Sequence, residues 1–225
     1  MKGIGSVAFS RNRRSKSIKI SVKPDKSVLV SFPYHVSSKS VIEFVKKNEA
    51  WIQRQQSKFE IRLNLFSDGS VFKTKHFIVN FSQGFENKAK KKDENVFITI
   101  KDFSSAESRV FIEKTITEIY RFEAKNILPS RLKKLAEQFG FSFNNVTVRN
   151  NKRNWGSCSS RNNISLNLQM MKMPDKLIDY ILLHELVHTE IKNHSPKFWE
   201  KLNTVTDNKA RALAKEVKQY STYFI

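Results

Sequence analysis

Alternating apolar and polar residues near the start of the chain predict a β-hairpin. Residues 17–32 place apolar side chains at every second position on either side of a turn at residues 24–27, which is the pattern of half-buried strands joined by a tight connection. An apolar stripe at helical spacing follows, so we expect a helix that is capped by Ser38 or Ser40 and runs to about Lys58.

Strand patterns return further along the first half. Phe72–Phe81 and Val96–Ile100 are rich in β-branched and aromatic residues, and we expect two strands there. The segment between them, residues 87–93, is mostly charged and is predicted to be the solvated tip of a hairpin.

The spacing changes from strand-like to helical midway along the chain. Residues 106–139 carry apolar side chains three or four apart, and Pro129 within them predicts either two helices or one kinked helix that ends at Gly140. Beyond it we expect two short strands, over Val146–Arg149 and Ile164–Leu168. We also expect three helices: one from Pro174 to about Lys192, one that begins at Ser195-Pro196, and one over about Asn208–Tyr220. The chain is therefore expected to be α+β, with a β-rich region at 1–104 and a helix-rich domain at 105–225.

Composition excludes several classes of protein. The 225 residues are 39% hydrophobic and include 18 Phe, which is too apolar for a disordered chain. The single cysteine, Cys158, excludes a disulfide framework and a thiolate-based zinc site, so histidines and carboxylates are the candidate metal ligands. Because no apolar run is long enough for a signal peptide or a membrane span, we expect a cytoplasmic protein that does not enter a membrane.

A large positive charge points to anionic partners. Lys and Arg number 41 against 21 Asp and Glu, which gives a net charge of +20. Nucleic acid is the obvious partner, and basic clusters at residues 11–14 and 131–134 would serve such a contact. The alternative is a basic surface without a dedicated ligand, because net charge does not identify a site.

The most specific chemical signal is the sequence His-Glu-Leu-Val-His at residues 184–188. Positions i and i+4 of a helix lie on one face, so His184 and His188 can bind one metal ion together, with Glu185 beside the water of that ion. The surrounding helix is apolar almost all round and is expected to be buried. Burial of two imidazoles and a carboxylate is costly unless something pairs them, and a metal ion does so.

A third metal ligand must come from beyond this helix. Catalytic zinc has three protein ligands and one open position, and a continuous helix would turn His194 to the wrong side. Lys192-Asn193 can end the helix, since Asn tolerates the left-handed conformation, and thereby return His194 to the ion. Glu200 on the next helix is the rival ligand, while Glu190 follows the motif too closely and points elsewhere.

These groups predict hydrolysis of an amide, most simply a peptide bond. One zinc ion per chain would activate water and polarise the carbonyl, while Glu185 takes the proton of the water and passes it to the leaving amine. A structural zinc site and histidines satisfied within the core are the competing interpretations. The oxyanion needs a donor, and the candidates are Tyr180, one turn before His184, and also Arg153, Asn154 and Tyr223.

Several segments between residues 151 and 199 occur in an order typical of one family: WGSCSS, the strand at 164–168, HELVH and NHSPKFW. In this order they resemble the catalytic segment of the YgjP-like metal-dependent hydrolases, relatives of the SprT-like zincin metallopeptidases. The stretch SIKISVKPDKSVLVSFPY near the start is similar as well. The resemblance covers nearly the whole chain and is strongest over residues 149–200.

This resemblance implies a zincin-like domain at 105–225, in which a small sheet packs against the helix of the motif. It also implies roles for four residues: His184, His188 and His194 as ligands of one Zn²⁺, and Glu185 as the catalytic base. The longer-motif zincins have Gly where this chain has Ile191, which favours a helix that runs slightly further before it bends.

Substrate contacts are implied for the strand before the motif, because such a strand borders the cleft in zincin proteases. A peptide would add to the edge of this strand, near Trp155, Asn163, Ser165 and Asn167. The alternatives are an ordinary core strand and a Trp155 that anchors a loop. Cys158 is either a latent zinc ligand or a small buried thiol.

Three functions follow from these observations. The first is a zinc metallopeptidase that acts on peptides or proteins. The second is a DNA-associated protein whose peptidase acts on proteins bound to nucleic acid. The third is a non-catalytic binding module that keeps its metal only for folding.

Overall fold

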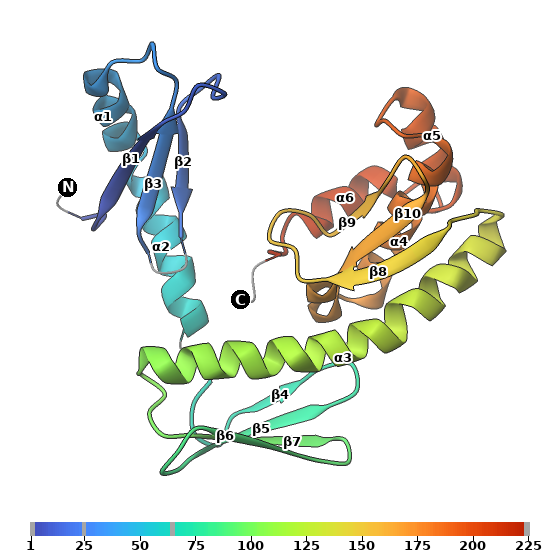
Figure 1. Ribbon diagram of the computed structural model, residues 1–225, viewed down its shortest axis with the longest axis horizontal. Coiled ribbons are helices and arrows are strands. Elements are labelled where there is room, and N and C mark those ends of the chain that lie inside the picture. The colour runs from blue at the N-terminus through green and yellow to red at the C-terminus, as the bar shows by residue number, and fades with distance from the viewer. Residues whose placement is uncertain (1–2, 24–25, 64–65, 223–225) are drawn as a thin grey trace. The chain divides into compact units, whose positions relative to one another are not determined.

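The structure of the protein is a computed structural model that describes residues 3–23, 26–63 and 66–222, except for the side chains of 58–63. Helices and small mixed sheets make up both the first and the second part of the chain (Figure 1). The predicted α+β class is therefore confirmed.

The chain divides into two compact units, the first ending at Phe66 and the second beginning at Ser67. The predicted boundary at 104/105 instead marks the place where strands give way to a long helix. The strands between Ser67 and residue 104 and the long helix after residue 105 belong to the same unit. The change from strands to helix therefore does not coincide with the division between the units.

The first unit contains a three-stranded sheet in the order β1-β3-β2. Strands β2 (Lys19–Val22) and β3 (Val28–Phe32) pair antiparallel, which confirms the predicted hairpin, although residues 24–25 of its predicted turn lie outside the described residues. Strand β1 (Val7–Arg11) joins β3 in parallel. The apolar pattern does not predict β1, because its side chains are almost all exposed and show no alternation.

The single helix predicted after the hairpin is two helices, α1 (Ser38–Lys47) and α2 (Glu49–Leu63). The break falls at Asn48, where the backbone leaves the helical conformation with φ −103° and ψ 12°. The N-cap is Ser37, whose hydroxyl accepts a hydrogen bond from the amide of Ser40 at 3.1 Å. The predicted caps are therefore wrong by one and three positions, since three neighbouring serines satisfy the same capping rule.

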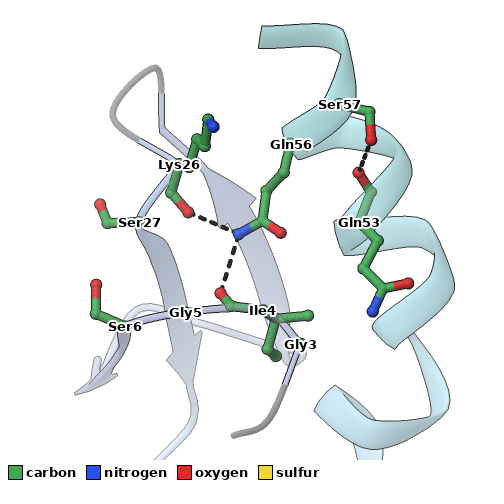
Figure 2. A pocket seen from close by; sticks show the side chains of 9 residues that line it. All are labelled: Gly3, Ile4, Gly5, Ser6, Lys26, Ser27, Gln53, Gln56 and Ser57. Carbon is green, nitrogen blue, oxygen red and sulfur yellow. Dashed lines mark hydrogen bonds between the residues drawn. The ribbon is translucent and has the colours of Figure 1, made fainter. Parts of the chain in front are cut away.

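Gln56 of α2 ties two loops of the first unit together. Its Nε2 donates to the backbone carbonyls of Ile4 at 3.0 Å and Lys26 at 2.8 Å, as Figure 2 shows. Ile4 is buried in the core of this unit together with Val30 and Ile52. One amide side chain thus satisfies two carbonyls beside the core.

The second unit begins with a four-stranded sheet in the order β4-β5-β7-β6. Its strands are β4 (Val71–Lys73), β5 (Ile78–Gln83), β6 (Lys88–Lys92) and β7 (Asn95–Ile100). The strand predicted over 72–81 is two strands, and the predicted solvated tip at 87–93 is mostly the edge strand β6. Its five side chains are exposed, so pairing with β7 overrides a composition that disfavours strands.

Helix α3 (Ala106–Phe139) is one continuous helix that contains Pro129. Ser105 caps its start, and Gly140 ends it in the left-handed conformation with φ 74°, as the sequence predicts. The helix runs along the β4–β7 sheet and continues to the elements that follow it (Figure 1). Its buried carboxylate, Glu123, accepts hydrogen bonds from the Thr74 hydroxyl and from the amide of His76 at 2.7 Å.

The rest of the second unit comprises β8 (Asn145–Arg149), β9 (Gly156–Cys158), β10 (Asn163–Asn167), the 3-10 helix η1 (Leu168–Lys172), α4 (Asp175–Glu190), α5 (Pro196–Thr204) and α6 (Ala210–Val217). The strand order is β8-β10-β9, and α4 packs on β9. The predicted packing of a small sheet against the helix of the motif is confirmed. The short β9 escapes prediction because its three residues are too few to show a period.

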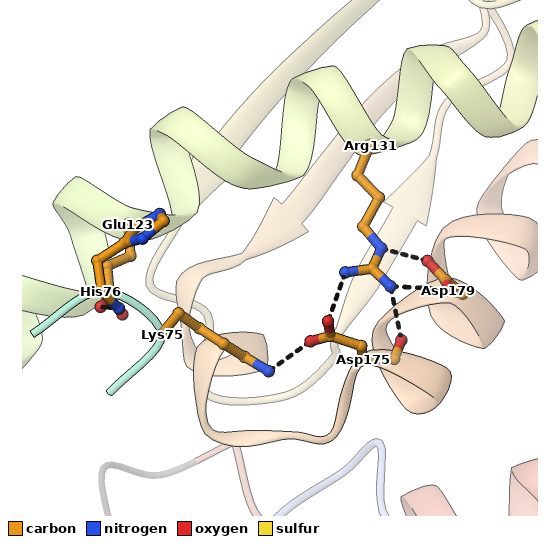
Figure 3. Close-up of polar contacts among 6 residues, drawn as sticks. All are labelled: Lys75, His76, Glu123, Arg131, Asp175 and Asp179. Carbon is orange, nitrogen blue, oxygen red and sulfur yellow. Dashed lines mark hydrogen bonds and ion pairs between the residues drawn. The ribbon is translucent and has the colours of Figure 1, made fainter. Parts of the chain in front are cut away.

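Arg131 of α3 holds the start of α4 in place. Its Nε and Nη2 donate to the two oxygens of the Asp179 carboxylate, and its Nη1 lies 3.1 Å from Asp175 Oδ2. Lys75, in the turn between β4 and β5, pairs with Asp175, as Figure 3 shows. The paired carboxylates raise the pKa of the Arg131 guanidinium, above all through the hydrogen bond to Asp179. Two-pronged contacts of this kind orient a helix as well as stabilising it.

We expect Arg131→Met to lower the free energy of unfolding of the second unit by about 1–2 kcal/mol, because the partly buried Asp179 and the exposed Asp175 both lose their charged donor. Urea denaturation in a Trp51→Phe background measures this, since Trp155 and Trp199 then report on the second unit alone. Arg121→Met is the matched control. Arg121 forms an exposed pair with Glu118, and the expected change is below about 0.5 kcal/mol. Equal losses in both variants would contradict the role of Arg131.

Across the described ranges, no helix is both long enough and apolar enough to cross a membrane.

Candidate metal centre

Three imidazoles converge at the end of α4. Nε2 of His194 lies 3.1 Å from Nε2 of His184 and 3.2 Å from Nε2 of His188. One nitrogen from each ring lies within 4.8 Å of the other two. Among the His, Cys, Asp and Glu side chains that the structure describes, these three form the one cluster able to hold a metal ion.

The backbone brings His194 to the pair by leaving the helix early. Helix α4 ends at Glu190, and Ile191 is extended with φ −121° and ψ 102°. The predicted helix to Lys192 is therefore too long, and the expectation that Ile191 prolongs the helix is wrong. Asn193 does not adopt the predicted left-handed conformation. Its Oδ1 accepts from the amide of Ser195 at 3.2 Å and so supports the turn into α5.

Phe198 of α5 packs against the rings of all three histidines. It is fully buried, and its ring centroid lies 4.9 Å from that of His184, 4.5 Å from that of His188 and 4.8 Å from that of His194. The sequence analysis missed this residue. Phe198 lies in the first turn of the helix that begins at Pro196, and no local sequence pattern marks it as a neighbour of the three rings.

The ring of His188 is oriented by the backbone. Its Nδ1 lies 2.9 Å from the carbonyl of Ile191, so an Nδ1–H donor leaves the Nε2 lone pair free to face the other two rings. Burial, with the neighbouring His188 and His194, lowers the pKa of His184 to about 3. Burial also lowers the pKa of His188. His184 and His188 are therefore favoured as neutral imidazoles, which are the form that binds metal.

Glu185 lies beside this cluster with its carboxylate buried. Only 5% of the residue is exposed, and burial raises the pKa of Glu185 to about 8. Its Oε2 has no hydrogen-bond partner among the described residues. A buried carboxylate with an unsatisfied oxygen is costly to keep, and it is suited to exchange a proton with a reacting group.

Gly156 of β9 makes room for this carboxylate. A Cβ atom at Gly156 would lie 2.6 Å from Cγ and 2.7 Å from Oε1 of Glu185, which is closer than carbon and oxygen atoms pack. The sequence analysis quoted the WGSCSS segment but did not identify this role. The glycine is required by the close approach of a side chain on another element, and the local sequence carries no trace of it.

The residues considered as hydrogen-bond donors to an oxyanion differ in burial and in their neighbours. Tyr180 is buried, its ring lies 6.1 Å from that of His184, and burial raises its pKa to about 12. Arg153 and Asn154 are exposed, and Tyr223 lies outside the described residues. The sequence analysis did not consider Arg211, whose charge acts on Tyr180 and whose guanidinium carbon lies 3.6 Å from the ring centroid of Trp199.

The four predicted substrate contacts differ in their surroundings. Trp155 is half-buried, and its ring lies 5.8 Å from Nζ of Lys172. Asn163 is exposed, while Ser165 has a buried hydroxyl that hydrogen-bonds to none of the described groups. Asn167 is fully buried and donates to the carbonyls of Asn151 and Asn154, so it holds the loop before β9 in place.

The predicted addition of substrate to the edge of the 163–168 strand conflicts with the sheet order. Strand β10 lies in the centre, paired with β8 on one side and β9 on the other, so its backbone has no free edge. The edge next to α4 belongs to β9. Sequence alone could not reveal this, because β9 follows β8 in the chain but pairs on the far side of β10.

The other candidate ligands lie apart from the histidine cluster. Neither Glu190 nor Glu200 is part of it, and Glu190 pairs with Lys201 at 3.1 Å. Cys158 also lies outside it, and burial raises the pKa of its thiol. The two remaining histidines, His35 and His76, belong to other parts of the fold.

The two basic clusters considered for nucleic acid have different partners. Arg131 is committed to Asp175 and Asp179 and is not available to a phosphate. In the first unit, Arg11 and Arg13 lie over the rings of Phe32 and Tyr34. Binding of nucleic acid stays a prediction.

Comparison with known proteins identifies a family that matches most of the chain. The pattern of the family described as "YgjP-like, metallopeptidase domain" matches residues 16–220. No curated protein matches the chain. Two crystal structures of metallopeptidase zymogens are each similar over 41% of this chain. That of Pyrococcus abyssi abylysin has a TM-score of 0.38 and 21% sequence identity, with 93% of its own chain covered. That of Methanocaldococcus jannaschii jannalysin has a TM-score of 0.37 and 23% sequence identity, with 94% of its own chain covered. The predicted SprT-like relationship stays a prediction.

Proposed function

Since the chain belongs to the YgjP-like metallopeptidase family, we propose that it is a zinc-dependent peptidase that hydrolyses peptide bonds at the histidine cluster of α4 and α5. Family and cluster together imply a metal ion. The observation that carries the proposal is the convergence of three Nε2 atoms beside a buried carboxylate. A purely structural zinc site closes with four protein ligands and has no need of such a carboxylate.

The spacing of the three rings supports zinc as the ion. Tetrahedral zinc with Zn–N bonds of about 2.0–2.1 Å places its nitrogen ligands about 3.3 Å apart. The two Nε2 separations of 3.1 and 3.2 Å are close to this value. Three neutral nitrogens facing one another repel unless a cation or protons lie between them, and imidazole is a preferred ligand of zinc. We assign one zinc ion per chain to His184, His188 and His194.

In the proposed reaction, Glu185 moves the proton. His184, His188 and His194 would hold the zinc ion, which would supply a water of lowered pKa and polarise a carbonyl. Glu185 accepts a proton from the attacking water as its oxygen bonds to the carbonyl carbon, and then donates it to the departing amide nitrogen as the C–N bond breaks. Tyr180, one turn before His184 on α4, is the proposed donor to the oxyanion.

The proposed substrate is an extended peptide segment beside β9. This strand lies at the edge of its sheet, against α4, and Gly156 within it contacts Glu185. An extended peptide can add to such an edge by backbone hydrogen bonds. Trp155 and the exposed Asn163 remain candidate contacts, while the buried Asn167 supports the loop instead.

The experiment that tests this function is metal analysis of the untagged chain beside His194→Ala. We expect about one zinc per wild-type chain and binding at least about 100-fold weaker in the variant, since loss of a ligand exceeds the effect of losing its supporting group. His76→Ala is the control, because His76 lies outside the cluster.

Two results of the metal analysis would contradict the site. Absence of zinc from wild-type protein reloaded with the metal would exclude a three-histidine centre. Unchanged zinc in His194→Ala would exclude His194 as the third ligand.

A further inference from the structure

A second surface of the unit that begins at Ser67 has the character of a binding groove. It lies between the edge strand β6 and α3 and has a volume of about 530 Å³. Carbon atoms make up most of its wall, to which Phe77, Phe111, Ile119 and Phe122 contribute. Half of Phe122 is exposed, although large apolar side chains are normally covered when they lie together.

The groove is open at Ala89, whose small side chain leaves space that a larger side chain would fill. Ala89 pairs with Ile98 across β6 and β7, and paired residues share a face of an antiparallel sheet. Ile98 is buried, yet Ala89 is exposed. The sheet therefore turns an apolar face toward α3 that α3 does not cover at the β6 edge.

The part of α3 that lines the groove is about as long as strand β6 on the other side of it. The residues of α3 along the groove run from Phe111 to Phe122 at helical spacing, which is about 16 Å at 1.5 Å per residue. An extended strand of about five residues has the same length. Strand β6 itself has five residues.

Lysines dominate the rim of the groove. Lys88, Lys90, Lys91 and Lys114 line it, with Glu118 as the one acidic residue among the lining groups. Arg121 lies 3.3 Å from Glu118 and offsets its charge.

These lysines differ in their partners. Lys88 pairs with the exposed Glu86 at 3.0 Å, and Lys91 lies over the rings of Phe77 and Phe122 at 4.8 and 5.1 Å. Lys90 and Lys114 form no ion pair with any residue that the structure describes. Lys90 pairs with Phe97 and therefore extends from the face of the sheet away from Ala89, whereas Lys114 belongs to α3. The groove thus offers an apolar floor, with uncompensated positive charge from Lys114 beside it and from Lys90 on the far face of the β6 edge.

We propose that this groove binds an extended peptide segment in which acidic residues alternate with apolar ones, added as a further strand to the edge of β6. Lys88 and Lys90 pair with Thr99 and Phe97 and therefore lie on the face of the sheet away from Ala89. The acidic side chains of the peptide meet these lysines on that face, the apolar ones enter the groove on the other face, and the backbone pairs with β6. A second copy of this chain does not fit, because β6 against β6 would place lysines opposite one another.

Two features favour a peptide over a nucleic acid. Apolar surface predominates in the groove, whereas sites for nucleic-acid strands combine stacking rings with groups that track the phosphates over a longer surface. The β6 edge also presents backbone donors and acceptors at the spacing of another strand. The proposal concerns docking and is independent of the histidine cluster.

Fluorescence anisotropy of the full chain with a labelled ten-residue peptide of alternating Glu and Phe or Val tests the proposal. We expect saturable binding that Lys90→Glu/Lys114→Glu weakens at least about tenfold. Lys133→Glu/Lys134→Glu changes the net charge equally on exposed residues outside the groove, and should alter affinity less than about twofold. Ala89→Phe, which fills the groove without changing charge, should also weaken binding. Circular dichroism verifies that each variant is folded.

Three results would overturn the proposal. One is the absence of binding by the acidic peptide, and another is equal binding of a peptide with Lys in place of Glu. The third is an equal loss of affinity in the two double variants, which would reflect overall charge. A single-stranded oligonucleotide that binds and responds to the groove variants, when the peptide does not bind, would assign the groove to nucleic acid instead.

Discussion

Glu185→Gln is expected to lower kcat for peptide hydrolysis by about 10²–10⁴-fold, the usual contribution of a general acid–base group. Glutamine has nearly the same shape but cannot accept and return the proton. Only 5% of Glu185 is exposed, and its Oε2 is unpaired within the described structure, so the substitution replaces a costly buried acid with a neutral amide. We therefore expect the zinc content of the variant to match that of the wild type, and its free energy of unfolding to be no lower.

Single-turnover kinetics with a quenched fluorescent peptide, alongside zinc analysis, separates this loss of chemistry from a loss of metal. Glu190→Gln is the matched control. It changes the same residue type on the same helix, but Glu190 is exposed and paired with Lys201, so activity should stay within about twofold. Full activity of Glu185→Gln would exclude this residue as the base. Equal inactivity of Glu190→Gln would show that the assay reports on the helix instead of the proton transfer.

Gly156→Ala is expected to reduce kcat by about 10²-fold, the effect of displacing a catalytic group by roughly 1 Å. The added Cβ would meet the Glu185 side chain at 2.6–2.8 Å, so the carboxylate must move. The backbone of Gly156 itself does not have a positive φ, and alanine is therefore tolerated there apart from this contact. Zinc content should be unchanged, because the contact is with Glu185 and not with the histidines.

A double-mutant cycle makes this prediction specific. If Gly156→Ala acts through Glu185, it should have almost no further effect on activity in a Glu185→Gln background, since groups that act as a unit are strongly non-additive. Ser157→Ala, at the exposed neighbouring position, is the control for disturbance of β9. Additive losses would mean that Gly156 affects activity by another route.

The sequence predicts the histidine cluster well because the determinants are local. The i, i+4 relation of His184 and His188 follows from helix geometry alone. The return of His194 follows from a required change of direction before Ser195-Pro196. The structure brings the three rings together, although it ends the helix at Glu190 by an extended Ile191 instead of a left-handed Asn193. The chain can therefore leave the helix in more than one backbone conformation and still bring His194 to His184 and His188.

The features that escape prediction depend on contacts between distant segments. Strand β6 is too rich in lysine to look like a strand, and only its pairing with β7 defines it. The central place of β10 depends on where β9 pairs. Gly156 and Phe198 matter because of side chains that approach them from other elements. Propensity and period describe one segment at a time and therefore cannot reveal such relations.

The three imidazoles come from two segments: His184 and His188 from α4, and His194 from the turn that leads into α5. Any ion held by all three is thermodynamically linked to the docking of α5 on α4. The free energy with which the ion favours the docked arrangement equals the free energy with which docking favours the ion. Local opening of α5 would therefore leave a two-histidine site of low affinity, and release of the ion would loosen α5 in turn.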